Sequence, residues 1–288
     1  MARGGHTPGG QTPKELTPDS GRKLFGLQLR KARQQRGLSM DTFIEEFVGR
    51  TRTPISKASL GRIERGEYLA QPVLPSLLDR FFETKNDLFV DMYELACLES
   101  VPHQYQLSAN LEQQAVAIKV YCGSVIPGLL QTEAYARELL RTWRPGDEGW
   151  SETQVILRRK RQARLFSDDP PMLSVLVDEA ALTRQIGTPE VMRTQLEFVL
   201  GMVDTPTCEI QMVPASLGAH GLLGGTLILM TTPRGQTYAY EEAISTGTLV
   251  EAPERLQHLG RHWDRLWGRS LSPMETARYL KNALEALP

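Results

Sequence analysis

The chain has 288 residues, of which 41% are hydrophobic and 23% are charged, and its formal net charge is -1 at pH 7. This length and apolar content predict about two domains with at least one sizeable core, and they exclude a wholly disordered chain. The charge is unevenly divided, because residues 1–70 hold 13 Lys or Arg and 7 Asp or Glu, a net charge of +6, which leaves -7 on residues 71–288. A basic first part indicates nucleic acid, or less readily an acidic membrane surface, as its partner.

Cysteine and histidine give no sign of a disulfide framework or a metal site. Cys97, Cys122 and Cys208 are widely spaced, with no Cys-x-x-Cys pair and no His cluster at zinc-ligand spacing. The longest mostly apolar stretch, 222–230, is far shorter than the ~20 residues that cross a bilayer. Residues 1–20 lack the apolar region of a signal peptide and are expected to form a flexible tail. We therefore expect a reduced, cytoplasmic protein with no cofactor, no metal and no membrane partner.

Residues 21–98 predict a compact, all-helical domain. Gly37 ends the first helix, which is amphipathic and basic, and Ser39 caps the second. A loop over 49–55 contains Arg50 and Arg52. The five predicted helices cover residues 24–36, 40–48, 57–65, 73–82 and 87–98.

The segment 55–66, with the sequence ISKASLGRIERG, is the most informative in the chain. If Ser56 is the N-cap, Leu60 and Ile63 point into the bundle, and the outward side chains are those of Lys57, Ala58, Ser59 and Arg62. A helix N-terminus with small residues, a Lys and an Arg can enter the ~12 Å major groove, and its N–H groups can hold a phosphate. Lys57 and Arg62 can donate to guanine, while Ala58 and Ser59 allow close approach to the bases. This pattern indicates a DNA-reading helix over 57–65.

Residues 119–288 predict an α+β domain, joined to the first by a polar connection over 99–118 that contains a short helix near 110–118. The alternation of segments predicts a small, antiparallel sheet of about four strands flanked by helices. The expected strands cover residues 172–177, 207–213, 225–230 and 237–241. The expected helices cover 132–143, 151–166, 178–184, 189–202, 253–267 and a last segment opened by Ser272, and Ser151 is taken as the start of a capping box.

Several residues of this domain have a functional and a structural interpretation. The basic run 158–161 is either a phosphate-binding strip or a solvated helix face, and the solvated face is favoured. His220, between glycines, lacks a nucleophile or second metal ligand at a recognisable spacing, so it is interpreted as a possible pocket residue and not as catalytic. Asp178 is expected to cap a helix. Trp263 and Trp267 share one helical face, which suits either the core or a partner contact.

Residues 24–98 resemble the helix-turn-helix domain of the xenobiotic-response-element (XRE) regulator family, to which phage repressors also belong. The resemblance rests on residues 29–33 (LRKAR), 37–39 (GLS), the segment 56–66, and Leu74-Pro75. It implies an ion pair between Arg33 and Glu64. It also implies that the base-reading positions are those of Lys57, Ala58, Ser59 and Arg62.

Three departures from this family affect the expected DNA affinity. The second helix opens with Ser39-Met40, where the family has Thr-Gln and uses the Gln on a phosphate. The turn before the third helix is longer than usual, and its Arg50 and Arg52 are expected to replace that contact. Glu67 stands where many members carry a basic residue and is expected to weaken binding to the DNA backbone.

Most of the remaining chain resembles the C-terminal domain of actinobacterial antitoxin-like transcriptional regulators. The matching segments are residues 121–140, 158–165, 177–196, 211–224 and 271–275. In that family the gene commonly neighbours one for a small protein, and the pair is described as toxin-antitoxin-like or developmental. The resemblance therefore implies a small partner protein.

Together these observations predict a sequence-specific DNA-binding transcriptional regulator that is dimeric, cytoplasmic, nucleoid-associated and not an enzyme. Its partners would be double-stranded DNA, a second copy of the chain, and a small protein or a small-molecule ligand sensed by the second domain. One alternative is an antitoxin-like interaction protein that mainly binds a small partner and uses DNA binding for autoregulation. Another is that the second domain is an enzyme or a ligand sensor with a pocket near His220.

Overall fold

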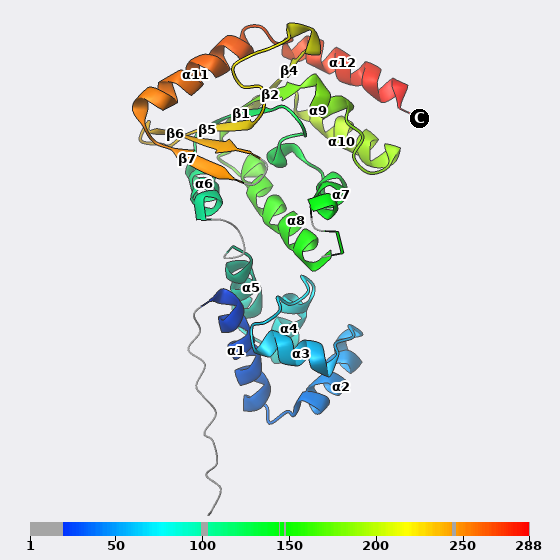
Figure 1. The fold of residues 1–288 in the computed structure, drawn as a ribbon. Helices are drawn as coiled ribbons and strands as arrows, with labels where there is room; N and C mark the ends of the chain where they lie inside the picture. Colours follow the sequence, from blue (N-terminus) through cyan, green and yellow to red (C-terminus); the bar gives the residue numbers. More distant parts are fainter. Residues whose placement is uncertain (1–19, 99–102, 144, 147, 244–245, 288) are drawn as a thin grey trace, which may run out of the picture. The chain divides into compact units, whose positions relative to one another are not determined.

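The computed structural model describes residues 20–98, 103–143, 145–146, 148–243 and 246–287 (Figure 1). The chain divides into two compact units, Met1–Ala96 and Cys97–Pro288. The tail expected over 1–20 lies outside the described residues except for Ser20. In the described part of the chain, no helix is both long and apolar enough to cross a bilayer.

The first unit is all-helical, and the prediction of five helices is confirmed. Ser39 and Ser56 cap two of them, each by accepting a hydrogen bond from a backbone N–H three residues on. Gly37 and Gly66 follow two helix ends with positive φ, which glycine adopts without a steric penalty. The helices are α1 (Gly21–Gln35), α2 (Met40–Thr51), α3 (Lys57–Glu64), α4 (Leu74–Phe82) and α5 (Leu88–Leu98).

Helix α2 runs further than the sequence predicted. It continues past Val48 to Thr51, so the first three residues of the expected loop 49–55 are helical. Gly49 therefore lies within a helix, where it costs about 1 kcal/mol relative to Ala and is tolerated. Arg52, in the left-handed conformation at φ 56°, ends the helix instead.

The core of this unit is a cluster of aromatic rings from α1, α2, α4 and α5. Phe43 stacks on Phe47 with 5.3 Å between ring centroids and meets the edge of Phe81 at the same distance. Phe82 and Phe89 continue the cluster at 5.8 Å. All five rings are buried, and such pairs add to the stability that burial alone provides.

Helices α1 and α3 approach each other backbone to backbone. A Cβ atom at Gly26 would lie 2.2 Å from the carbonyl oxygen of Ile63, and one at Gly66 would lie 2.8 Å from the Cα atom of Lys23. Only glycine fits at these two points. The contact fixes α3 against α1, which determines the edge of α3 that faces outward.

The second unit is a mixed α+β domain. The expected connection over 99–118 is, in its described part, the helix α6 and the start of strand β1. Helix α8 begins before Ser151, which is buried inside it, so the expected capping box there is wrong. The helices are α6 (His103–Gln114), α7 (Glu133–Trp143), α8 (Glu148–Ala163), α9 (Glu179–Thr183), α10 (Pro189–Met202), α11 (Pro253–Trp267) and α12 (Pro273–Ala286), with short 3-10 turns η1 (Gly128–Leu130), η2 (Arg164–Phe166) and η3 (Ala215–Leu217).

The sheet of this unit has seven strands in the order β3-β4-β2-β1-β5-β6-β7. Strands β4, β2 and β1 are parallel, and the other neighbours pair antiparallel. The expectation of a small antiparallel sheet of about four strands is therefore wrong. Strands β1, β3 and β7 were not predicted. Strands β3 and β7 are short, and the start of β1 was assigned to a helix. The strands are β1 (Ala117–Cys122), β2 (Met172–Asp178), β3 (Asp204–Thr205), β4 (Cys208–Val213), β5 (Thr226–Thr231), β6 (Thr237–Glu242) and β7 (Gly247–Val250).

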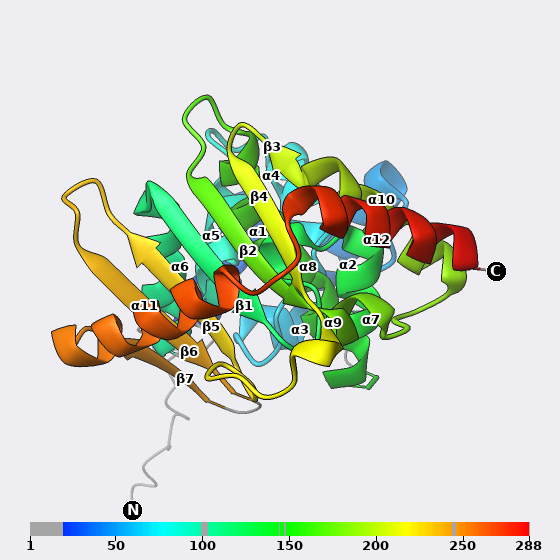
Figure 2. The ribbon, with the colours of Figure 1, turned by 90° about the horizontal axis from the view of Figure 1, so that it is seen from above.

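The two faces of the sheet are covered differently. Helix α11 lies across one face, where Leu259, Trp263 and Leu266 pack on Tyr121 and Leu229 (Figure 2). Helices α6, α7, α8 and α10 cover the other face, as Figure 1 shows. Near β4, the hydroxyl of Thr276 on α12 accepts a hydrogen bond from the Met212 N–H at 2.9 Å.

The close contact at Gly26 generates a prediction. Gly26→Ala would force α1 and α3 apart, and such overpacking costs about 1–3 kcal/mol of unfolding free energy. Gly49→Ala is the matched control, since it adds a methyl group in a helix where nothing lies within 4 Å, and it should stabilise slightly.

Urea unfolding followed by far-ultraviolet circular dichroism measures both variants. Because all four Trp residues lie in the second unit, their fluorescence reports that unit separately. Equal effects of the two substitutions would contradict the backbone contact.

Candidate nucleic-acid interface

Helix α3 presents a polar edge that begins at its N-terminus. The Ser56 hydroxyl accepts a hydrogen bond from the Ser59 N–H at 3.1 Å and contacts the Ser59 hydroxyl at 2.9 Å. Leu60 and Ile63 are buried in the bundle, as the sequence predicted. Lys57, Ala58 and Arg62 are exposed, and Ser59 is half-buried.

Lys57 and Arg62, the two basic side chains of this edge, make weak, solvent-exposed contacts with their neighbours. The Lys57 Nζ lies 2.6 Å from Asp41 Oδ2, with side-chain exposures of 61% and 71%. The Arg62 guanidinium lies over the ring of Tyr68, 5.4 Å from its centroid. An exposed ion pair contributes at most about 1 kcal/mol, so a phosphate or a base could displace Asp41 from Lys57 at little cost.

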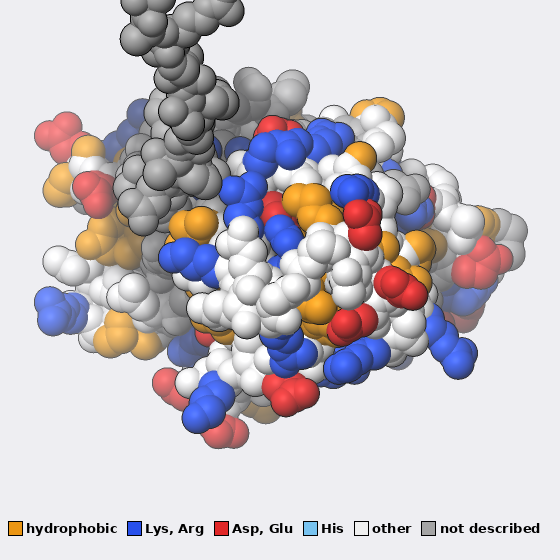
Figure 3. Space-filling model, turned by 90° about the horizontal axis from the view of Figure 1, so that it is seen from below, with side chains coloured by type: hydrophobic (Ala, Val, Ile, Leu, Met, Phe, Trp, Pro, Cys, Tyr) orange, Lys and Arg blue, Asp and Glu red, His pale blue; other side chains and the backbone are white. Residues whose placement is uncertain are grey.

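Arg50 and Arg52 lie at the end of α2, shortly before α3. The Arg50 guanidinium lies 5.3 Å from the ring centroid of Phe81, and Arg52 is exposed at the left-handed end of the helix. Figure 3 shows one face of the first unit, on which Lys and Arg side chains are interspersed with Asp and Glu. Positive charge on this face is therefore dispersed and does not form one continuous stripe.

A buried ion pair joins α1 to α3. Arg33 Nε and Nη2 donate to Glu64 Oε1 and Oε2 at 2.7 and 2.9 Å, and Nη1 donates to the Leu38 carbonyl at 2.8 Å. The side chains are 8% and 0% exposed. Hydrogen bonding to Glu64 raises the pKa of Arg33, so the pair is held in its charged form. The guanidinium fixes the third helix and the α1–α2 turn together.

The structure also places the two residues that depart from the XRE pattern. Met40 packs toward α3, since a Cβ at Gly61 would lie 3.9 Å from its Cε methyl group. Glu67 accepts hydrogen bonds from Arg65 at 2.6 and 3.1 Å, and these bonds lower the pKa of Glu67. The negative charge of Glu67 is thus partly balanced within the unit.

In the second unit, His220 is an internal contact and not an open pocket residue. Its side chain is 5% exposed, and its Nε2 lies 3.4 Å from the Tyr121 hydroxyl and 3.9 Å from Asp178 Oδ2. Nδ1 accepts a hydrogen bond from the Leu222 N–H, so Nε2 carries the proton of the neutral ring. Asp178 also caps α9 through the Ala180 N–H, as predicted. Burial lowers the pKa of His220 against the opposing attraction of Asp178.

The basic run 158–161 is only in part the solvated face that the sequence favoured. Arg161 donates to both carboxylate oxygens of Glu112 at 2.7 and 2.6 Å, and this pair is nearly buried. Arg158 donates to the Gln131 side chain, and burial lowers the pKa of Arg158. Arg159 and Lys160 are exposed, as expected. The inner arginines of α8 therefore hold α6 and the segment after η1 in place.

The expectation of no His pair at metal-ligand spacing is wrong, because His258 and His262 on α11 are separated by three residues. His258 and His262 are four residues apart in a segment that was predicted as helical, which places both on the same side. That spacing was the available signal. Trp263, in contrast, belongs to the core, where it is 3% exposed and stacks on Trp267 at 4.7 Å.

Breaking the buried pair of the first unit should be costly. Glu64→Gln leaves the Arg33 guanidinium buried without its counter-charge, and removing one partner of a buried pair costs about 3–5 kcal/mol. Glu67→Gln is the matched control, because it makes the same change on an exposed acid paired with Arg65, and we expect little effect. Urea unfolding followed by circular dichroism measures both, and similar losses in the two variants would count against a structural role of the buried pair.

Protonation of His220 should destabilise the second unit. Because the folded pKa is lowered, the unfolded chain binds the proton more readily, and the free energy of unfolding falls as pH drops below about 6.5. His220→Gln removes this contribution. Urea unfolding followed by Trp fluorescence should therefore show a shallower loss of stability between about pH 7.5 and 5 in the variant. Parallel pH profiles would refute this expectation.

Comparison with known proteins gives one match. A family model described as a domain of unknown function (DUF5753) matches residues 105–282, which include most of α6, the whole sheet, α11 and most of α12. No curated protein and no solved structure matches the chain. Because the matched residues make up more than half of the sequence, the chain belongs to the DUF5753 family.

Proposed function

We propose that this protein is a sequence-specific DNA-binding transcriptional regulator of the XRE type, in which α2 and α3 act as a helix-turn-helix and α3 enters the major groove. The main support for the proposal is the exposed edge of α3. This helix is capped at its N-terminus, and the side chains of Lys57, Ala58 and Arg62 are exposed along it. The close contact with α1 supports it, because a reading helix must be held rigidly. The family description assigns no activity to the second unit.

Each residue of the edge has a role in this proposal. Arg62 leaves the Tyr68 ring and donates to guanine O6 and N7, and Lys57 exchanges Asp41 for a base or a phosphate. Ala58 and Ser59 let the helix approach the base edges. The N–H groups beyond Ser56 face a phosphate, as at other helix N-termini.

Arg50 and Arg52 supply the phosphate contacts that Met40 cannot make. Both are exposed and precede the N-terminus of α3 by a few residues. The Arg50 guanidinium lies over the Phe81 ring, so its substitution would also remove a contact within the first unit. Arg52 has no such ring contact among the described residues. Arg52 is thus the simpler probe of non-specific binding. Arg65 partly offsets the repulsion between Glu67 and the DNA backbone.

A single short helix reads only a few base pairs, so we propose that the protein binds as a dimer to two half-sites about 34 Å apart. The second unit would supply the dimer contact and sense a small partner protein or a ligand, as its resemblance to antitoxin-like regulators implies. The site of action would be the nucleoid in the cytoplasm.

Selection of bound sequences from a random DNA pool tests the proposal. We expect a defined motif with two half-sites, because each helix reads one of them. Arg62→Ala should then cost about 1–3 kcal/mol at one base position and relax the preference there, measured by titration of matched and mismatched duplexes. Unchanged binding would show that α3 is placed in the wrong register, and a single half-site would contradict the dimer.

Arg52→Ala should act differently from Arg62→Ala. Loss of a phosphate contact weakens binding to all sequences alike and lowers the salt slope of the affinity by about one unit. Lys85→Ala is the charge-matched control, since Lys85 is exposed in the turn between α4 and α5 and lies outside the proposed interface. If Lys85→Ala weakened binding equally, the loss would reflect the total charge of the protein and not a contact of Arg52, and the assignment of the interface would be overturned.

A further inference from the structure

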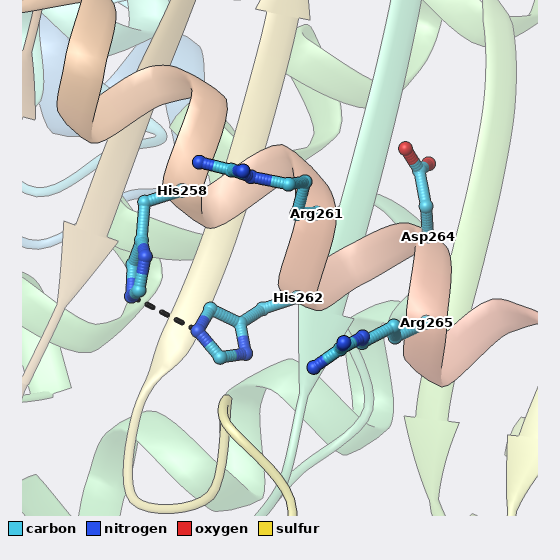
Figure 4. Close-up of a pocket in the computed structure, with 5 residues that line it drawn as sticks. All are labelled: His258, Arg261, His262, Asp264 and Arg265. Atoms are coloured by element: carbon cyan, nitrogen blue, oxygen red, sulfur yellow. Dashed lines mark hydrogen bonds between the residues drawn. The ribbon is translucent and has the colours of Figure 1, made fainter.

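One flank of α11 carries two imidazoles that face each other. The Nε2 atoms of His258 and His262 lie 2.9 Å apart, and their ring centroids are separated by 4.4 Å (Figure 4). The two residues are one helical turn apart, so their side chains leave α11 in the same direction. They border a hollow of about 620 Å³ that Arg261, Asp264 and Arg265 also line.

The backbone of the neighbouring loop holds one of these rings. A Cβ atom at Gly221 would lie 2.0 Å from Nδ1 of His262 and 2.5 Å from its Cε1. The loop therefore approaches the imidazole so closely that only glycine leaves room for the ring. His262 is half-buried as a result, whereas His258 is exposed.

We propose that His258 and His262 form a two-imidazole binding site for a divalent transition metal of the Cu²⁺ or Ni²⁺ class. Metal–imidazole bonds are about 2.0–2.1 Å long, so two nitrogens bound at a right angle lie about 2.9 Å apart. The distance between the Nε2 atoms has this value, which is also that of the hydrogen bond the two rings make, so a metal could replace that bond with little movement of either ring. Right-angled positions belong to the square-planar and tetragonal geometries of Cu²⁺ and Ni²⁺, whereas a tetrahedral Zn²⁺ site needs about 3.4 Å.

The rest of the coordination sphere is open. Among the described residues, no group of three or more His, Cys, Asp or Glu side chains is placed to hold a metal. Asp264 points away from the pair in Figure 4 and binds Lys119 at 2.9 Å. The metal would keep water in its other positions, and the proton that one Nε2 donates to the other would move to Nδ1 of its own ring, so that both Nε2 atoms are free to bind.

The charges around the two histidines lower the expected affinity for a metal cation and suggest a phosphate-type anion as the alternative ligand. Arg265 points toward His262 in Figure 4, and its positive charge opposes a cation. The same guanidinium, together with protonated imidazoles, would suit a phosphate-type anion. The spacing of the two Nε2 atoms favours the metal, because an anion would require both rings to be protonated, and two protonated Nε2 atoms 2.9 Å apart repel each other.

Titration of the full chain with Ni²⁺, on protein without a polyhistidine tag, tests the site by calorimetry. We expect one site per chain that is lost or weakened by at least about tenfold in His258→Gln and in His262→Gln, since removing even an outer partner of a metal ligand costs 10–100-fold. His103→Gln is the matched control, because His103 begins α6 on the other side of the sheet, and it should bind as the unaltered protein does. In the electron paramagnetic resonance spectrum of the Cu²⁺ form, two equatorial nitrogens are expected.

Two further variants separate the metal site from its rivals. Gly221→Ala keeps both ligands but displaces the His262 ring, and it should weaken Ni²⁺ binding, while Arg265→Gln should strengthen it. Binding of Ni²⁺ that is unaffected by His258→Gln and His262→Gln would overturn the proposal. So would a site that takes inorganic phosphate in place of Ni²⁺ and loses it in Arg265→Gln. Trp fluorescence of each metal-free variant, to which Trp263 and Trp267 of α11 contribute, checks that α11 remains packed.

Discussion

The contact between α1 and α3 is the constraint on which the first unit depends. Gly26 lets the backbone of α1 meet the carbonyl of Ile63, and the buried pair of Arg33 and Glu64 closes the same contact at the other end of α1. A cap at Ser56 and apolar side chains can form a helix, but they do not orient it. Because α1 holds α3 at two points, the edge with Lys57 and Arg62 has one fixed direction, which a DNA-reading helix requires.

The second unit uses buried arginine in a related way. Arg161 joins α8 to Glu112 of α6, and its planar guanidinium satisfies both carboxylate oxygens. On the opposite face of the sheet the contact is apolar, and Leu259, Trp263 and Leu266 turn one side of α11 inward. The same helical period places His258 and His262 on the flank of α11 beside this core, each one position before a core residue. The core of this face and the proposed metal site are therefore two consequences of one amphipathic helix.

Prediction from the sequence succeeded where a short-range signal decides the outcome. The ends of α10 and α11 and the caps at Ser39, Ser56 and Asp178 depend on residues within a few positions of one another. It failed where a local signal competes with distant packing. Gly49 resembles a helix stop, yet Phe47 is buried in the aromatic cluster and α2 continues. Strand β1 was missed because its first residues were assigned to a helix, it carries the polar Lys119, and it pairs only with strands far along the chain.

By itself, the sequence determined the division into a basic helical part and a mixed remainder, most helix bounds, and the residues that α3 exposes. Only the tertiary structure decided the strand order, the parallel pairing of β1, β2 and β4, the contacts of Arg161 and His220 with Glu112 and Asp178, and the approach of Gly221 to His262. The physical reason is the range of the interactions. Helical periodicity and capping are encoded within one or two turns, whereas sheet order and close packing depend on residues that meet only after folding.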